Sequence, residues 1–101
     1  MKPADLAQMR RHAGEAAQLL GMLSHPSRLL VMCELVSGER TAGELVELSG
    51  LSQSALSQHL AKLRESGLVA TRQEAQSVHY RLADPDVTRI VRVLHDIYCR
   101  S

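Results

Sequence analysis

The segment "TAGELVELSG" at residues 41–50 constrains the fold more than any other stretch, because it marks where one short helix begins and ends. Thr41 and Glu44 match the T-x-x-E capping box, in which each side chain bonds the backbone N–H of the other residue. This box predicts a short helix that runs through Leu48. Gly50 then predicts a tight turn, so another element is expected within a few residues.

The next segment, "LSQSALSQHLAKLRESGLV" at residues 51–69, predicts a helix from about Gln53 to Ser66. Ser52 is the expected N-cap and Gly67 the expected C-terminal stop. One face of this helix carries Leu56, Leu60 and Leu63, and the opposite face carries Ser54, Ser57, Gln58 and Ala61. Two helices joined by a tight turn, the second polar on its outer face, indicate a helix-turn-helix.

The flanking sequence predicts the remaining elements. They are a helix over residues 5–23, a helix that begins at Pro26 and ends near Gly38, a hairpin of residues 68–74 with 77–82 that turns near Ala75 and Gln76, and a last helix that begins at Asp84 and Pro85. The last helix has an apolar side made of Val87, Ile90, Val91, Leu94, Ile97 and Tyr98. The sequence therefore predicts a mainly α fold with a small β-hairpin, a winged helix-turn-helix that forms a single domain over residues 1–101.

Composition indicates the kind of core and the class of partner. Of 101 residues, 45% are hydrophobic but only 2% are aromatic, so the core must be aliphatic, which suits packed helices. A core of this size is often completed by pairing with a second copy. The net charge of +1 is too small for a general nucleic-acid coat, so binding to DNA would need positive charge gathered locally.

The chain contains no apolar run as long as a membrane span, and its first residues lack the apolar stretch of a signal peptide. We therefore expect a cytoplasmic protein without a membrane partner. In that compartment Cys33 and Cys99 are expected to be thiols at rest, and any disulfide between them to be transient or regulatory.

The polar face of the second helix fits double-stranded DNA, because a major groove admits one helix and presents hydrogen-bond donors and acceptors on its base edges. The candidate DNA-binding residues are Ser52, Gln53, Ser54, Ser57, Gln58, His59, Lys62 and Arg64 on this helix, with Arg72, Gln73, Gln76, Ser77, His79 and Arg81 on the wing. Lys62 and Arg64 lie where phosphates would pass. The alternatives are a solvated helix face or an interaction module that has lost DNA binding.

The chain resembles the ArsR/SmtB family of winged-helix repressors over almost its full length. The stretches that carry the resemblance are "LSHPSRLLVMCEL", "LSQSALSQHLAKLRESGLV" and "EAQSVHYRL". The resemblance implies a homodimer formed through the first and last helices, which binds an imperfect inverted repeat of operator DNA. It also implies repression that an inducer relieves by lowering DNA affinity.

Two metal-site patterns of that family are absent here. The helix of residues 41–50 contains no cysteine, and in the last helix Asp86 is followed by Thr88 where the family pattern has histidine. His95 is present, but Tyr98 replaces the family's glutamate. The isolated His12 and His25 are interpreted as surface or helix-end residues, so no metal and no cofactor is predicted.

The two cysteines resemble those of the HlyU/BigR/SqrR-like branch of the family, which responds to reactive sulfur species or oxidants. In that branch one cysteine lies on the second helix and one at the end of the last, as Cys33 and Cys99 do here. The resemblance implies that thiol chemistry at this pair, giving a disulfide or a polysulfide bridge, switches DNA affinity. Taken alone, Cys33 also fits a core-filling role, and two thiolates also fit a thiophilic metal or metalloid. A further alternative is a DNA-binding regulator that responds to no ligand.

No enzyme motif is present. The sequence lacks G-x-S-x-G, H-E-x-x-H and a phosphate-binding loop. We therefore predict a protein that is not an enzyme.

Overall fold

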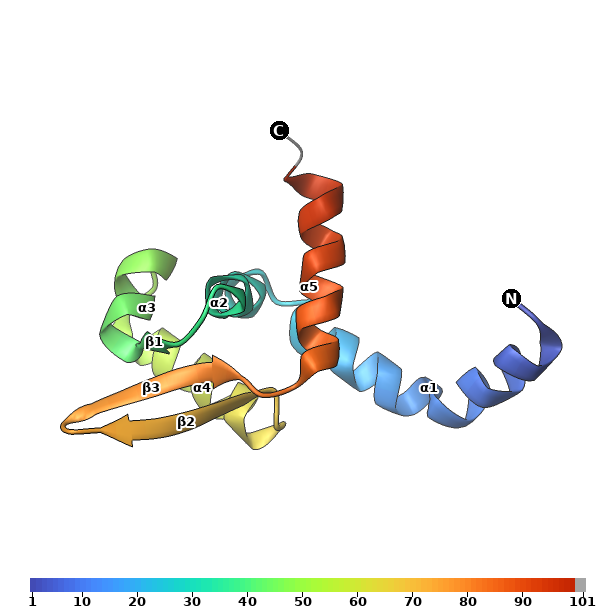
Figure 1. Ribbon diagram of the computed structural model, residues 1–101, viewed down its shortest axis with the longest axis horizontal. Helices are drawn as coiled ribbons and strands as arrows, with labels where there is room; N and C mark the ends of the chain where they lie inside the picture. The colour runs from blue at the N-terminus through green and yellow to red at the C-terminus, as the bar shows by residue number, and fades with distance from the viewer. Residues whose placement is uncertain (100–101) are drawn as a thin grey trace.

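A computed structural model describes residues 1–99 as five helices and a three-stranded sheet (Figure 1). The elements are α1 (Pro3–Leu23), α2 (Pro26–Val36), β1 (Arg40–Thr41), α3 (Ala42–Ser49), α4 (Gln53–Glu65), β2 (Val69–Glu74), β3 (Ser77–Leu82) and α5 (Pro85–Tyr98). This order confirms the predicted winged helix-turn-helix, with α3 and α4 as the helix pair and β2–β3 as the wing.

The sheet contains one strand that the sequence did not predict. Its strand order is β1-β3-β2, and β1 pairs antiparallel with β3 through Arg40 opposite Tyr80 and Thr41 opposite His79. Two residues are too short to show an alternating pattern, so only the packing of the wing against this segment makes it a strand. Strand β1 therefore joins the wing to the helix-turn-helix.

Capping interactions fix the starts of α3 and α4 where the sequence predicts them. The backbone N–H of Thr41 donates to Glu44 Oε1 at 2.9 Å, and that of Glu44 donates to Thr41 Oγ1 at 3.2 Å. Ser52 Oγ accepts from the backbone N–H of Ala55 at 3.1 Å. Gly50 has a φ of 70°, a left-handed conformation that glycine adopts without a Cβ penalty, so the turn between the helices stays tight.

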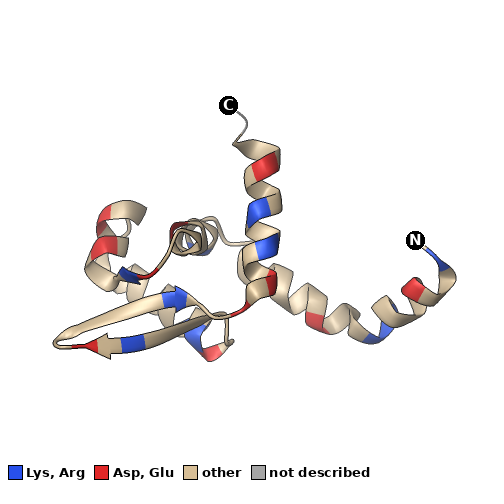
Figure 2. Cartoon of the chain, viewed as in Figure 1, with Lys and Arg blue, Asp and Glu red and all other residues tan. Residues whose placement is uncertain are grey.

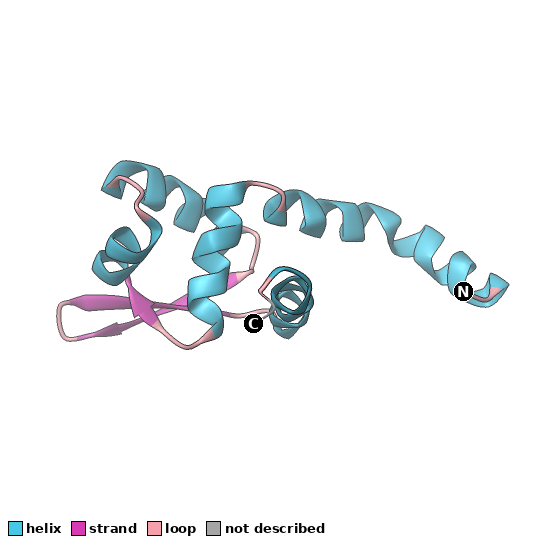
Figure 3. Ribbon diagram, turned by 90° about the horizontal axis from the view of Figure 1, so that it is seen from above, coloured by secondary structure: helices cyan, strands magenta, loops and turns pink. Residues whose placement is uncertain are grey.

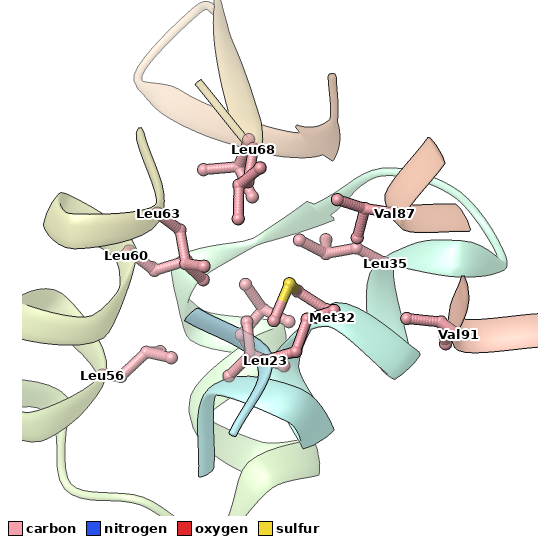
Figure 4. Close-up of a cluster of buried hydrophobic side chains, with 12 residues drawn as sticks. Leu23, Met32, Leu35, Leu56, Leu60, Leu63, Leu68, Val87 and Val91 are labelled. Carbon is pink, nitrogen blue, oxygen red and sulfur yellow. The ribbon is translucent and has the colours of Figure 1, made fainter. Parts of the chain in front are cut away.

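Apolar side chains from every helix meet in one core between α2, α4 and the base of the wing (Figure 4). The core consists of Leu23, Val31, Met32, Leu35, Leu45, Leu56, Leu60, Leu63, Leu68, Val69, Val87 and Val91. Its members are aliphatic, as the composition predicts. Because Leu56, Leu60 and Leu63 all lie in it, the core orients α4 and leaves the opposite face of that helix in solvent.

Helices α1 and α5 extend away from this core in different directions (Figures 1 and 3). Leu23 is the one residue of α1 that is buried, and Leu6, Met9 and Leu20 are each about half exposed. Toward the end of α5, Ile97 and Tyr98 are also exposed. A single copy of the chain therefore leaves two apolar helix surfaces uncovered.

Within residues 1–99, no single helix is long and apolar enough to cross a membrane. Among the described helices, α1 and α2 taken together satisfy that length and composition test, and these two helices meet at an angle of 90°.

Candidate nucleic-acid interface and thiol groove

Helix α4 has one buried face and one exposed face, as its sequence predicts. Leu56 is 1% exposed and Leu63 is fully buried, and these side chains fix the rotation of the helix about its axis. The candidate DNA-binding residues Ser52, Gln53, Ser54, Ser57 and Gln58 are all exposed at its start and on its outer face. Short polar side chains of this kind suit close approach to base edges.

Two cations follow on the last turn of α4. Lys62 and Arg64 are exposed and form no ion pair with any residue in 1–99. They lie at the C-terminal end of the helix, where a positive charge interacts favourably with the helix dipole. Both cations are therefore accessible to phosphate groups.

The wing carries both signs of charge (Figure 2). Arg72 donates to Glu39 at 2.7 Å and to Glu74 at 2.9 Å, whereas Arg81 forms no ion pair within the described part of the chain. The acidic partners of Arg72 were not identified from the sequence. Glu74 is two residues from Arg72 on the same strand face, so the sequence could have predicted that ion pair. Glu39 comes close to Arg72 only because the sheet brings their segments together.

Burial alternates along β3 at its base but not near the tip. Tyr80 and Leu82 are half-buried and Arg81 between them is exposed, whereas Val78 is exposed and His79 is half-buried. The wing extends beyond the core at Val78, so nothing covers that side chain. His79 lies in the row that contains Thr41 and Arg72 and is 3.8 Å from Glu74. Gln73, Gln76 and Ser77, by contrast, are exposed near the tip.

His59 lies apart from the outer face of α4 and faces the start of α2. Its ring centroid is 4.6 Å from that of His25, whose Nδ1 accepts from the backbone N–H of Ser27 at 3.2 Å and so caps α2. Burial lowers the pKa of His59, and the positive charges of His25, Arg28 and Lys62 lower it further. Sequence alone indicated His25 as a helix-end residue but not this contact between the two helices.

The lowered pKa of His59 predicts a loss of stability in mild acid. Around the ordinary histidine pKa of about 6.5 the unfolded chain binds more protons than the folded chain, so the free energy of unfolding falls as pH drops through that value. Thermal denaturation at pH 7.5 and pH 5.5 should show a smaller pH-dependent drop in Tm for His59→Gln than for the unmodified chain. His12→Gln, at an exposed position on α1, serves as the control and should keep the full drop. Equal drops in all three proteins would contradict this assignment.

Cys33 on α2 and Cys99 after the last turn of α5 line the same groove. Both residues are exposed, so Cys33 does not have the core-filling role that its apolar neighbours in the sequence allowed. The groove has a volume of about 800 Å³, and its walls include Leu29, Leu30, Val36, Val91 and Leu94. Two thiols separated by 66 positions in the chain therefore open onto one largely apolar space.

The local environment disfavours ionisation of the Cys33 thiol. Desolvation raises the pKa of Cys33, and the nearby negative charges of Cys99 and Glu34 raise it further. A raised pKa lowers the fraction of thiolate at neutral pH, and the thiolate is the reactive form. Cys33 is therefore poorly suited to attack an electrophile first.

Within residues 1–99 there is no group of three or more His, Cys, Asp or Glu side chains placed to hold a metal ion. His12 pairs with Glu15 at 3.6 Å, and His95 lies 3.7 Å from Asp96, both at exposed positions. These pairs are consistent with surface roles for the two histidines.

The exposed polar face on α4, the exposed cations at its end and the adjoining hairpin define a winged helix-turn-helix protein of the DNA-binding class. Residues 25–71 match the family model described as bacterial regulatory protein, arsR family. Together with full-length relatives above 40% identity, this match shows that the chain belongs to the arsR family of bacterial transcriptional regulators, which are not enzymes.

Three proteins illustrate these similarities. The transcriptional activator HlyU of Vibrio cholerae is 43% identical over 98% of this chain and 92% of its own length. The solved structure of reduced HlyU from that species matches with a TM-score of 0.87, at 44% identity, over 92% of this chain and 98% of that one. The transcriptional repressor BigR from Xylella fastidiosa matches with a TM-score of 0.89, at 42% identity, over the whole of both chains.

A more distant match is the homodimeric winged helix-turn-helix DNA-binding domain of a possible ArsR-family regulator from Mycobacterium bovis. Its TM-score is 0.74, at 25% identity, over 96% of this chain and 86% of that one.

Proposed function

We propose that this chain is a homodimeric repressor that binds operator DNA through α4 and the wing, and that reactive sulfur species or oxidants lower its DNA affinity by linking Cys33 and Cys99. The observation that carries the proposed switch is the groove that both thiols line. It joins the end of α5 to the middle of α2, so a bond across it constrains two helices at once.

The proposed base contacts come from Ser54, Ser57 and Gln58, since these side chains are exposed and short enough to reach base edges from a helix lying in the major groove. Ser52 and Gln53 contact the DNA backbone at the start of α4. Phosphate contacts come from Lys62, Arg64 and Arg81, with Gln73, Gln76 and Ser77 following the adjacent groove.

The proposed dimer covers the apolar surfaces that a single copy leaves exposed. Leu6, Met9 and Leu20 on α1, with Ile97 and Tyr98 on α5, supply these surfaces. A two-fold dimer presents two copies of α4 in opposite orientations, which suits an inverted repeat. The two half-sites must then be about 34–36 Å apart, one turn of DNA, so the dimer has to hold its two α4 helices at that spacing.

The proposed thiol reaction begins at Cys99, because the raised pKa of Cys33 leaves that residue mostly as the thiol. The Cys99 thiolate attacks the outer sulfur of an organic persulfide, which transfers that sulfur to Cys99 and releases the organic thiolate. Cys33, once deprotonated, attacks the Cys99 sulfur and displaces hydrosulfide, leaving a disulfide. With an oxidant such as diamide, two thiols lose two protons and two electrons to the reagent and give the same bond.

The linkage affects DNA binding through α5. In the proposed dimer α5 contributes to the interface, while its start packs on the core through Val87 and Val91. Tying the end of α5 to α2 shifts the position of one copy relative to the other. The spacing of the two α4 helices then changes as well. A tenfold loss of affinity requires the linked and unlinked forms to differ by only about 1.4 kcal/mol in the free energy of DNA binding.

The experiment that tests this function compares the unmodified chain with Cys33→Ser and Cys99→Ser. Each protein is reduced, treated with diamide or with an organic persulfide, and titrated against a duplex selected from a random library by the reduced protein. We expect treatment to weaken binding at least tenfold for the unmodified chain and to leave both variants unchanged. Mass spectrometry of the treated chain should show one peptide pair linked through residues 33 and 99.

Several outcomes would contradict the proposal. If the reduced protein selects no duplex, the proposed DNA binding is rejected. If treatment releases DNA from the Cys→Ser variants as well, the proposed thiol switch is rejected. Retention of an arsenical or mercuric ion by the purified dimer, with no linked peptide, would favour a metal or metalloid sensor instead.

Brief alkylation with N-ethylmaleimide should label Cys99 before Cys33, and the opposite order would contradict the proposed first step.

A further inference from the structure

Arg72 is the most strongly paired charged residue of the wing. Its Nε is 2.7 Å from Glu39 Oε1 and one of its terminal nitrogens is 2.9 Å from Glu74 Oε2. The two carboxylates raise the pKa of the Arg72 guanidinium, and the guanidinium in turn lowers the pKa of Glu74. The sequence indicated Arg72 as a candidate DNA contact, but both of its strong hydrogen bonds are made within the chain.

The sheet register explains how these three residues meet. Arg72 lies opposite His79, and His79 lies opposite Thr41, so the three residues form one row across β2, β3 and β1. Glu39 precedes β1 by one residue, and the Arg72 side chain must pass over β3 to reach it. His79 is accordingly half-buried in the middle of this row, with its Nε2 3.8 Å from Glu74.

The charges of this cluster oppose DNA binding at this point. One guanidinium and two carboxylates carry a net charge of −1, and a DNA phosphate approaching Arg72 would have to displace an existing carboxylate. Arg81 is the matched contrast, since it lies on the same strand face of the wing, opposite Ala70, and has no acidic partner within residues 1–99.

We propose that Glu39 and Glu74 hold Arg72 away from the DNA backbone and thereby weaken sequence-independent binding to DNA. Affinity for DNA of any sequence grows with the number of phosphates that a protein neutralises, whereas base contacts from α4 distinguish one sequence from another. Withholding one cation from the wing lowers affinity for all sequences and leaves the contribution of α4 intact. The absolute affinity for DNA is therefore lower and less dependent on salt, while the discrimination between sequences stays with α4. This inference rests on the DNA binding proposed above.

The test measures binding of a random-sequence 30-base-pair duplex by fluorescence anisotropy at several salt concentrations, with reduced protein. The slope of log K against log salt reports the number of phosphate contacts. We expect Arg81→Gln to reduce the magnitude of the slope by about one, and Arg72→Gln to leave it unchanged. We expect Glu39→Gln with Glu74→Gln to strengthen binding about fivefold to tenfold at 0.1 M salt and to steepen the slope by about one, because Arg72 then becomes free to pair with phosphate.

Adding Arg72→Gln to the double glutamine variant should return both affinity and slope to those of the unmodified chain. This third variant separates the release of Arg72 from a general effect of removing acidic groups. If the double variant does not fold, Glu74→Gln alone is used, since Glu74 is well exposed near the wing tip and should show about half of the effect.

Three results would overturn the proposal. The first is a reduced slope for Arg72→Gln alone, since that would mean that Arg72 contacts phosphate in the unmodified chain. The second is unchanged affinity in the double variant. The third is a gain that survives the added Arg72→Gln substitution. If the unmodified chain binds neither the random duplex nor any selected duplex, both this inference and the proposed DNA-binding function are rejected; failure confined to the glutamate variants rejects this inference alone.

Discussion

Replacing Ser57 and Gln58 together by alanine is expected to weaken binding to the selected duplex by roughly 10- to 100-fold. Both side chains are exposed on the outer face of α4, and neither forms a hydrogen bond that contributes to the fold within residues 1–99. A good bidentate contact to a base is worth about 1–3 kcal/mol of discrimination, so losing the contacts of both residues reaches this range. Alanine also favours helix formation, so the loss is not attributable to an unfolded α4.

The measurement is a titration of the selected duplex and of a random-sequence duplex with each protein in the reduced state. Affinity for the random duplex should change little, because phosphate contacts carry most of that binding. The matched control replaces Gln8 and Ser37, one glutamine and one serine that are exposed on other parts of the chain. Unchanged affinity of the α4 variant for its selected duplex would mean that α4 is not the recognition helix.

The second large effect is expected for Leu63→Ala, which should lower the free energy of unfolding by about 2–5 kcal/mol. Leu63 is fully buried and lies with Leu56 and Leu60 in the core that orients α4 (Figure 4). Removing three carbons leaves a cavity that the surrounding helices fill only in part, which adds to the loss of apolar burial.

Chemical denaturation of the reduced proteins at one fixed concentration measures this change, since the stability of a dimer depends on concentration. Leu48→Ala is the matched control, because Leu48 is half exposed on α3 and the same substitution there should cost about 1 kcal/mol or less. Similar losses for both variants would contradict the assignment of Leu63 to the core.

Local signals in the sequence predicted most of the helix-turn-helix. The T-x-x-E box at Thr41, the turn at Gly50 and the N-cap at Ser52 each depend on residues three or fewer positions apart, and the structure confirms all three. Helix ends differed by one residue, as α3 extends to Ser49 and α4 ends at Glu65. Helix ends fray, so a boundary is defined only to within one or two residues.

Contacts between distant segments were not predictable in the same way. Strand β1 has only two residues, and it exists because the wing packs beside it. The contact of His59 with His25 and that of Arg72 with Glu39 join positions that are more than 30 residues apart. The sequence made both residues candidates for DNA contact, His59 on the predicted recognition helix and Arg72 on the wing, whereas the structure gives each a partner within the chain.

The sequence by itself determined the order of the helices and the wing, the aliphatic core and the outward polar face of α4, because these depend on periodicity and on caps formed by nearby residues. Only the tertiary structure decided that Cys33 and Cys99 share a groove, that Arg72 is held by two carboxylates and that α1 leaves an apolar surface exposed. The physical reason is that hydrogen bonds of a helix or cap connect near neighbours, whereas ion pairs, shared grooves and exposed faces depend on how distant elements pack.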